Sequence, residues 1–159
     1  MPADIFEWLE SSDLSVYIRQ STLLFPVIGI IHIVGFIFLT GCAFLFDLRL
    51  LGVSKKLPVS QVADYVLPWS RRSLWLVVPS GLLLFVSQAK ALSTNPVFGI
   101  KLLLILIALV NAALFHAITF KTVSSWQSRG VPAMARMAAV ISLGAWISVI
   151  ICGRLIAYF

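Results

Sequence analysis

The chain has 159 residues, of which 60% are hydrophobic and only 11% are charged, and its mean hydropathy is +1.03. A soluble domain of this length needs far more charged surface, so the composition excludes an ordinary water-soluble protein and predicts extensive contact with a lipid bilayer. The net charge of +6 comes largely from short segments between apolar runs. We therefore expect no nucleic-acid partner.

Residues 1–22 form the first distinct segment of the chain. Here Ile5 and Trp8 stand among the acids Glu7 and Glu10. Apolar and charged side chains mixed in this way predict an amphipathic segment that lies in the membrane interface instead of crossing the bilayer.

Four apolar segments follow, and each is long enough to cross a hydrocarbon layer about 30 Å thick. Asn95 and Pro96 fit the N-cap and the first turn of the third segment. The later connections are short, so consecutive segments should be neighbours. The sequence therefore predicts an all-α protein, an integral membrane up-down four-helix bundle formed by residues 23–159. Its spans are expected at about 23–46, 73–92, 97–120 and 134–157.

The lysines and arginines predict how this bundle sits in the membrane. Eight of them, including Arg129, lie in the segment 47–72 and in the segment around the third connection, and four lie on the other side. Positively charged loops stay in the cytoplasm, so we expect a multi-pass protein of the bacterial inner membrane with periplasmic N- and C-termini. Residues 57–67 form a second amphipathic stretch, expected to lie on the membrane surface.

The two histidines of the chain lie in different predicted spans, His32 in the first and His116 in the third. Two imidazoles on separate membrane helices are the minimum ligand set for a b-type haem that exchanges electrons with quinone. Gly29, on the same helical face as His32, would leave room for the porphyrin, and Arg154 would pair with a propionate. The same two imidazoles would alternatively bind a metal ion.

Depth is the weak point of a haem shared by His32 and His116. The predicted spans place the two imidazoles about 12 Å apart along the membrane normal, whereas the axial ligands of one iron lie at nearly the same depth. The alternative interpretation is that each histidine forms a hydrogen bond to a hydroxyl or carbonyl group of a neighbouring helix. The sequence leaves both interpretations open.

Four further polar residues within or beside the spans are functional candidates, because such groups are costly to place in lipid. Asp47 is expected to form an interfacial salt bridge with Arg71 or Arg72, and Lys101 to extend toward the outer surface. The amide of Asn111 is expected to form a hydrogen bond to the second or fourth span. The four candidates are Asp47, Arg49, Lys101 and Asn111.

Signatures of soluble enzyme chemistry are missing from the sequence, among them the P-loop, the dinucleotide-binding, the serine-hydrolase and the zinc patterns. We therefore expect a redox subunit, not an enzyme by itself, that passes electrons to or from quinone or a partner protein. Small residues along span 134–157 favour an alternative, a non-catalytic interaction or assembly subunit that docks a partner chain or a second copy. A small transporter component is a further alternative.

Four strings cover most of residues 30–159: HIVGFIFLTGCAFLFDLRLLG, PSGLLLF, NPVFGIKLLLILIALVNAALFH and GRLIAYF. Through these strings the chain resembles a family of small bacterial four-helix inner-membrane proteins of uncharacterised function. The resemblance implies the fold but no activity. The residues that match the family's pattern are His32, Asp47, Arg49, Asn95, Lys101, Asn111, His116 and Arg154.

Overall fold

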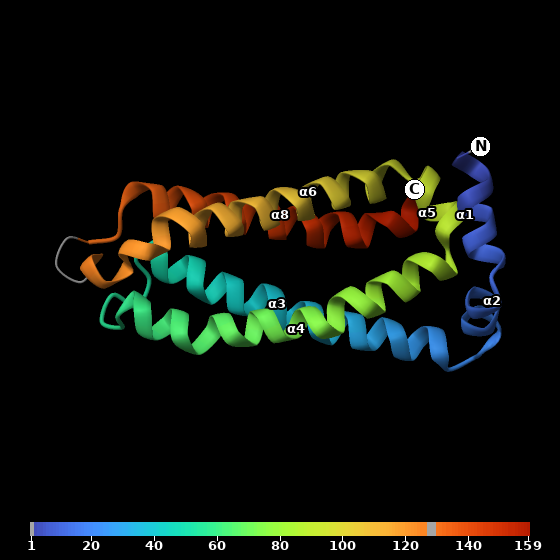
Figure 1. Cartoon of the computed structure of the whole chain (residues 1–159), viewed down its shortest axis with the longest axis horizontal. Coiled ribbons are helices and arrows are strands. Elements are labelled where there is room, and N and C mark those ends of the chain that lie inside the picture. The colour runs from blue at the N-terminus through green and yellow to red at the C-terminus, as the bar shows by residue number, and fades with distance from the viewer. Residues whose placement is uncertain (1, 127–129) are drawn as a thin grey trace.

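The computed structural model describes residues 2–126 and 130–159, and all regular elements within these two ranges are helical. Four long helices run side by side along the molecule (Figure 1). They are α3 (Leu24–Leu50), α4 (Val59–Ser87), α6 (Pro96–Leu114) and α8 (Ala133–Leu155). The shorter elements are α1 (Pro2–Ser11), α2 (Asp13–Gln20), α5 (Ala89–Thr94), the π-helical turn η1 (Phe115–Thr119) and the 3-10 turns η2 (Phe120–Ser125) and η3 (Ile156–Tyr158). The prediction of an all-α protein is confirmed.

The long helices pack as two antiparallel pairs, α3 with α4 and α6 with α8, and α3 also contacts α8 (Figure 1). Two apolar clusters hold the pairs together. One contains Phe46, Phe115 and Trp126 and lies at the end where α4 begins. The other contains Leu39 and Trp146 and lies further along the helices. Residues of both clusters border a cavity between the long helices.

The short helices α1 and α2 stand across the opposite end of the long helices (Figure 1). The Ser15 hydroxyl donates a hydrogen bond to the carbonyl of Val86 at 3.2 Å, and the guanidinium of Arg19 donates one to the carbonyl of Ser87 at 3.3 Å. Arg19 also forms an ion pair with Glu10 at 2.9 Å. These contacts fasten the predicted amphipathic segment to the end of α4.

Helix α6 begins where the sequence predicts. The Oδ1 atom of Asn95 accepts hydrogen bonds from the backbone N–H groups of Val97 and Phe98 at 2.9 and 3.2 Å, and Pro96 occupies the first turn. The amide nitrogen of Asn95 also donates a hydrogen bond to the carbonyl of Ile156 at 3.2 Å. One residue therefore caps α6 and ties its start to the end of α8.

Three stretches of helix are long and apolar enough to cross a membrane: Leu24–Leu50, Pro96–Ser124 and Ala133–Tyr158. Many of their large aliphatic side chains point outward, and in α6 itself Ala108 is the one buried residue. Such a surface is unfavourable in water and suits contact with lipid. Within the described ranges α4, which contains most of predicted span 73–92, does not reach the same apolarity, because Arg71 and Arg72 precede its apolar half.

The structure corrects the predicted boundaries of α4. Residues 57–67 are not a separate surface piece, because from Val59 onward they form the first turns of α4, and Ala63 is fully buried in the cluster around Phe46. At the other end the helix stops before Gln88, whose φ of −138° is not helical. The apolar run 73–92 is thus divided between α4 and α5.

Candidate functional site

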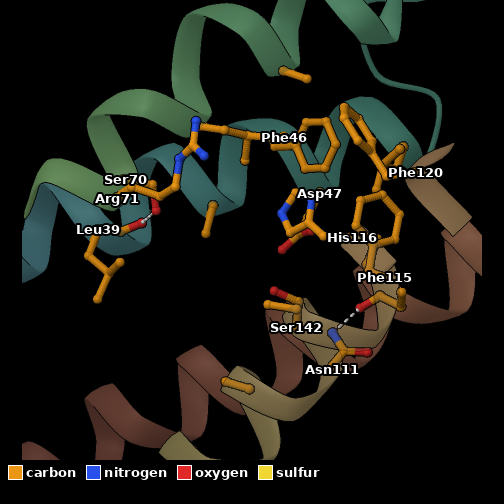
Figure 2. Close-up of a pocket in the computed structure, with 18 of the residues that line it drawn as sticks. Leu39, Phe46, Asp47, Ser70, Arg71, Asn111, Phe115, His116, Phe120 and Ser142 are labelled. Atoms are coloured by element: carbon orange, nitrogen blue, oxygen red, sulfur yellow. Dashed lines mark hydrogen bonds between the residues drawn. The ribbon is translucent and has the colours of Figure 1, made fainter. Parts of the chain in front are cut away.

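A cavity of about 660 Å³ lies between the four long helices, toward the end where α4 begins. Its walls are mainly apolar and include Phe46, Phe115 and Trp146. Polar side chains line it from each of the four long helices and from η1 (Figure 2). They are Asp47 of α3, Asp64, Ser70 and Arg71 of α4, Asn111 of α6, His116 of η1 and Ser142 of α8.

Asp47 differs from the other polar groups of this cavity. Its side chain is 6% exposed, and its Oδ2 atom has no hydrogen-bond partner in the described part of the chain. The Ser142 hydroxyl is the hydrogen-bonding group that faces this carboxyl group, as Figure 2 shows. The predicted salt bridge is not formed, because Arg72 lies over the ring of Trp69, 5.4 Å from its centroid, and the ion pairs of the described residues do not include Arg71. A buried carboxyl oxygen without a partner is costly, which makes the cavity a candidate ligand site.

His116 reaches the cavity from the π-helical turn that ends α6. The turn Phe115–Thr119 is wider than an α-helical turn, and such turns change the direction of side chains and are frequent at functional sites. The imidazole packs edge-on against Phe115 and Phe120, with ring centroids 5.4 Å apart in both cases. It lines the same cavity as Asp47 (Figure 2). Its ring nitrogens form no hydrogen bond to a described residue, so they are available to a ligand.

Asn111 connects two helices at the wall of the cavity. Its amide nitrogen donates a hydrogen bond to the backbone carbonyl of Ala138 in α8 at 2.9 Å. The predicted bond to the second or fourth span is confirmed, with a backbone acceptor in the fourth. Hydrogen bonds between membrane helices contribute about 0.6 kcal/mol on average, so Asn111 helps to hold α6 against α8.

His32 belongs to a different place, the crossing of α3 and α4. Its Nδ1 atom lies 3.1 Å from the carbonyl of Val77 and 3.0 Å from the hydroxyl of Ser80. The imidazole packs directly over Gly81, where an added Cβ would lie 3.0 Å from its Cε1 atom. His32 is therefore half-buried and hydrogen-bonded to a neighbouring helix. For this histidine, the structure agrees with the prediction of a bond to a hydroxyl or carbonyl group of another helix.

The structure keeps the two histidines apart. His116 packs on Phe120, whose ring lies 6.2 Å from that of Phe46. Phe46 follows His32 by 14 residues on the same continuous helix, which corresponds to about 21 Å along the axis. The imidazoles of His32 and His116 therefore lie near different ends of α3, an arrangement that does not suit the two axial positions of one haem iron. Among the described residues no cluster of three or more metal-ligating side chains occurs either.

The remaining predicted site residues lie outside the cavity. Nothing approaches Gly29 within 4 Å of an added Cβ, and Lys101 is half-buried with its Nζ 4.0 Å from the corresponding position of Gly153. Arg49 donates a hydrogen bond to the carbonyl of Leu57 at 2.6 Å. Arg154 is exposed and donates a hydrogen bond to the Tyr158 hydroxyl at 2.9 Å. Of these residues, Arg49 and Arg154 form hydrogen bonds within their own part of the chain.

Sequence reasoning paired Asp47 with Arg71 or Arg72 in a salt bridge, but it did not place Ser142 or the aromatic walls in a common site with Asp47. A signal for part of it exists, because Leu39, Ala43, Phe46, Asp47 and Leu50 recur at the spacing of one helical face. All five line the cavity. The sequence does not show how the other three helices are rotated about their axes, and this rotation brings their polar groups to the same face.

The fold and the cavity define a class: helical proteins whose apolar outer helices are compatible with a membrane and enclose a polar site. Residues 5–159 match a family of unknown function, DUF6644, and the chain belongs to this family. The resemblance to an uncharacterised family is thereby confirmed. No curated protein and no solved structure matches the chain.

Proposed function

We propose that the protein binds the polar ring of a quinone, or of a closely related lipid-soluble compound, in the cavity around Asp47. The observation that carries the proposal is that hydrogen-bonding side chains from the four long helices and from η1 meet at a space with apolar walls. One of them, Asp47, has a buried carboxyl oxygen without a partner among the described residues. In this role the chain is a small redox subunit that holds quinone for a partner protein in the membrane.

The chemistry of the lining suits both redox forms of such a ring. Arg71, His116 and Ser142 can donate hydrogen bonds to the two carbonyl oxygens of a quinone. Asp47 can accept a hydrogen bond from a hydroxyl of the reduced form. Aromatic side chains such as Phe46 offer edges and faces to the ring itself, and the apolar outer faces of the helices leave the tail in lipid.

The same proposal includes four membrane crossings in an up-down bundle, in which α4 is the second span and α1 and α2 lie at the interface. Antiparallel packing of α4 along α3 supports it, as does the position of both chain ends at one end of the molecule (Figure 1). The basic segments then face the cytoplasm of a bacterial cell and the termini face the periplasm. Arg129, counted in that charge bias, lies outside the described residues. Cysteine labelling of each terminus in intact cells tests this orientation.

Binding of a short-chain quinone to the purified full chain tests the proposed ligand. Quinones quench tryptophan fluorescence, and Trp146 stands in the cavity wall. Asp47→Asn and His116→Phe each remove a group that faces the ring, and we expect each to weaken binding about tenfold or more. His32→Phe is the matched control, because it removes an imidazole that lies outside the cavity. Absence of saturable binding, or an equal loss in the control, would contradict the proposal.

The Oδ2 atom of Asp47, which has no hydrogen-bond partner among the described residues, also favours a second candidate, a small transporter component. Acidic residues within membrane-length helices mark proton and ion pathways. Proteoliposomes that contain the protein can be tested for acidification of their interior under a solute gradient. Acidification that is lost in Asp47→Asn, together with no binding of quinone to the wild-type chain, would favour transport over quinone binding.

A further inference from the structure

A second cavity, of about 440 Å³, lies at the end of the molecule where α4 and α8 begin. Four basic side chains line it: Arg49, Lys55, Lys56 and Arg136. No acidic residue occurs among the described residues of its lining. This composition sets it apart from the cavity around Asp47, which holds two carboxyl groups and no lysine.

The segment between α3 and α4 is folded so that its lysines border this cavity. Gly52 has a φ of +105°, a conformation that side chains rarely adopt, and it lets the chain turn back after α3. The guanidinium of Arg49 holds the returning segment by donating hydrogen bonds to the carbonyls of Leu57 at 2.6 Å and Lys55 at 3.5 Å. The positive charges are therefore held close together by the fold, although like charges repel.

Two further features raise the positive potential of the same cavity. The first residues of α4, Val59 and Ser60, belong to its lining, and Val131 lies just before α8. Neither helix has a side-chain hydrogen bond at its N-cap, Pro58 or Pro132. The free N–H groups of both helix starts therefore add partial positive charge to that of the four side chains.

We propose that this cavity binds a phosphate-bearing anion, either the headgroup of an anionic phospholipid or a soluble phosphate compound. The four cations supply the charge, and the Ser60 hydroxyl and helix N–H groups supply further hydrogen-bond donors for phosphate oxygens. The position at one end of the membrane-length helices suits a lipid headgroup, for which basic pockets between membrane helices are known binding places. The proposal is independent of the quinone site.

The test uses the full chain in nanodiscs of phosphatidylcholine, with two separate additions. In one arm phosphatidylglycerol is included in the nanodisc and its enrichment around the protein is measured by native mass spectrometry. In the other arm inorganic phosphate is titrated and the shift in melting temperature is recorded. A response to phosphatidylglycerol alone identifies the lipid headgroup, and a response to phosphate identifies a soluble anion; either outcome supports the site.

The variant K55Q/K56Q removes two cations from the cavity, and R72Q/K121Q removes two cations that do not line it. All four side chains are exposed, so neither change should disturb folding, which circular dichroism checks. We expect the first variant to bind the anion about 30-fold more weakly than the wild-type chain and the second to bind it unchanged. Lack of response in both arms, or an equal loss in both variants, would overturn the proposal.

Discussion

His32 and Asp47 lie on the same helix, α3, and each interrupts an apolar stretch, yet their surroundings differ. The imidazole of His32 meets a carbonyl and a hydroxyl of α4 at 3.1 and 3.0 Å. The Oδ2 atom of Asp47 meets no partner in the described residues and borders a cavity. A polar group that bonds to a neighbouring helix serves helix packing, whereas a polar atom that is buried and unpaired points to a ligand. This difference indicates a structural role for the His32 end of α3 and supports the proposed binding at the Asp47 end.

The largest effect is expected from tightening the helix crossing near His32. In Gly35→Ala the new Cβ would lie 2.9 Å from the Cβ of Leu76 and 3.3 Å from the backbone nitrogen of Val77, so the helices must move apart. We expect a loss of about 1–3 kcal/mol in the free energy of unfolding in mixed detergent micelles. Gly29→Ala on the same helix meets nothing within 4 Å and should leave stability unchanged or slightly higher. Equal losses in the two variants would show that the crossing is not tightly packed.

Removal of the unpaired carboxyl should change stability in the opposite direction. Asp47→Leu replaces a buried oxygen that lacks a partner, and we expect a gain of about 1–3 kcal/mol in unfolding free energy together with loss of quinone binding. Denaturant titration and fluorescence quenching on the same preparation measure both quantities. A destabilised variant would show that Asp47 is part of the structural framework, and the distinction between the two ends of α3 would fail.

His32→Phe is expected to lower stability and to leave quinone binding nearly unchanged, which is the opposite of Asp47→Leu, and its effect should be smaller. It removes the hydrogen bonds to Val77 and Ser80 and should lower the unfolding free energy by about 1 kcal/mol. The affinity for quinone should stay within a factor of about two, because the imidazole does not line the cavity. If binding collapsed while stability did not change, His32 would belong to the ligand site.

The smallest effect concerns the cavity wall. Asn111→Leu breaks the hydrogen bond to Ala138 and should cost about 0.6 kcal/mol. Since Asn111 holds α6 against α8, a modest weakening of ligand binding should accompany this loss. Thermal unfolding followed by circular dichroism measures the first quantity, and a loss well above 2 kcal/mol would show that the wall depends on this bond far more than the contacts indicate.

The helices themselves are largely predictable, because hydrophobic runs of membrane length and the Asn95–Pro96 signal mark their positions directly. The start of α4 is not, since an amphipathic stretch such as 57–67 has the same pattern on a membrane surface and in the first turns of a packed helix. Burial of Ala63 beside Phe46 shows that the stretch belongs to a packed helix, and this burial is a tertiary contact that the sequence does not reveal. The π-helical turn at Phe115 is also not predictable from the sequence, because no glycine or proline marks it.

The candidate site was predictable only in part. His116 and Asp47 are visible as polar residues in apolar runs, but a sequence does not show that both line one cavity while His32 contacts α4 elsewhere along α3. A haem shared by His32 and His116 requires the two imidazoles to lie together, and their places on the helices do not support it. Pairing of side chains across helices follows from helix rotation and depth, which small differences in packing determine.

Photo-crosslinking with an azido-quinone, followed by peptide mass spectrometry, tests the separation of the two ends of α3 most directly. The assignment of binding to the cavity around Asp47 predicts adducts in peptides that contain Phe46 and Phe115 to Phe120, and their disappearance on competition with unlabelled quinone. Adducts concentrated around His32 and Val77 to Gly81, or no competable adduct at all, would contradict it.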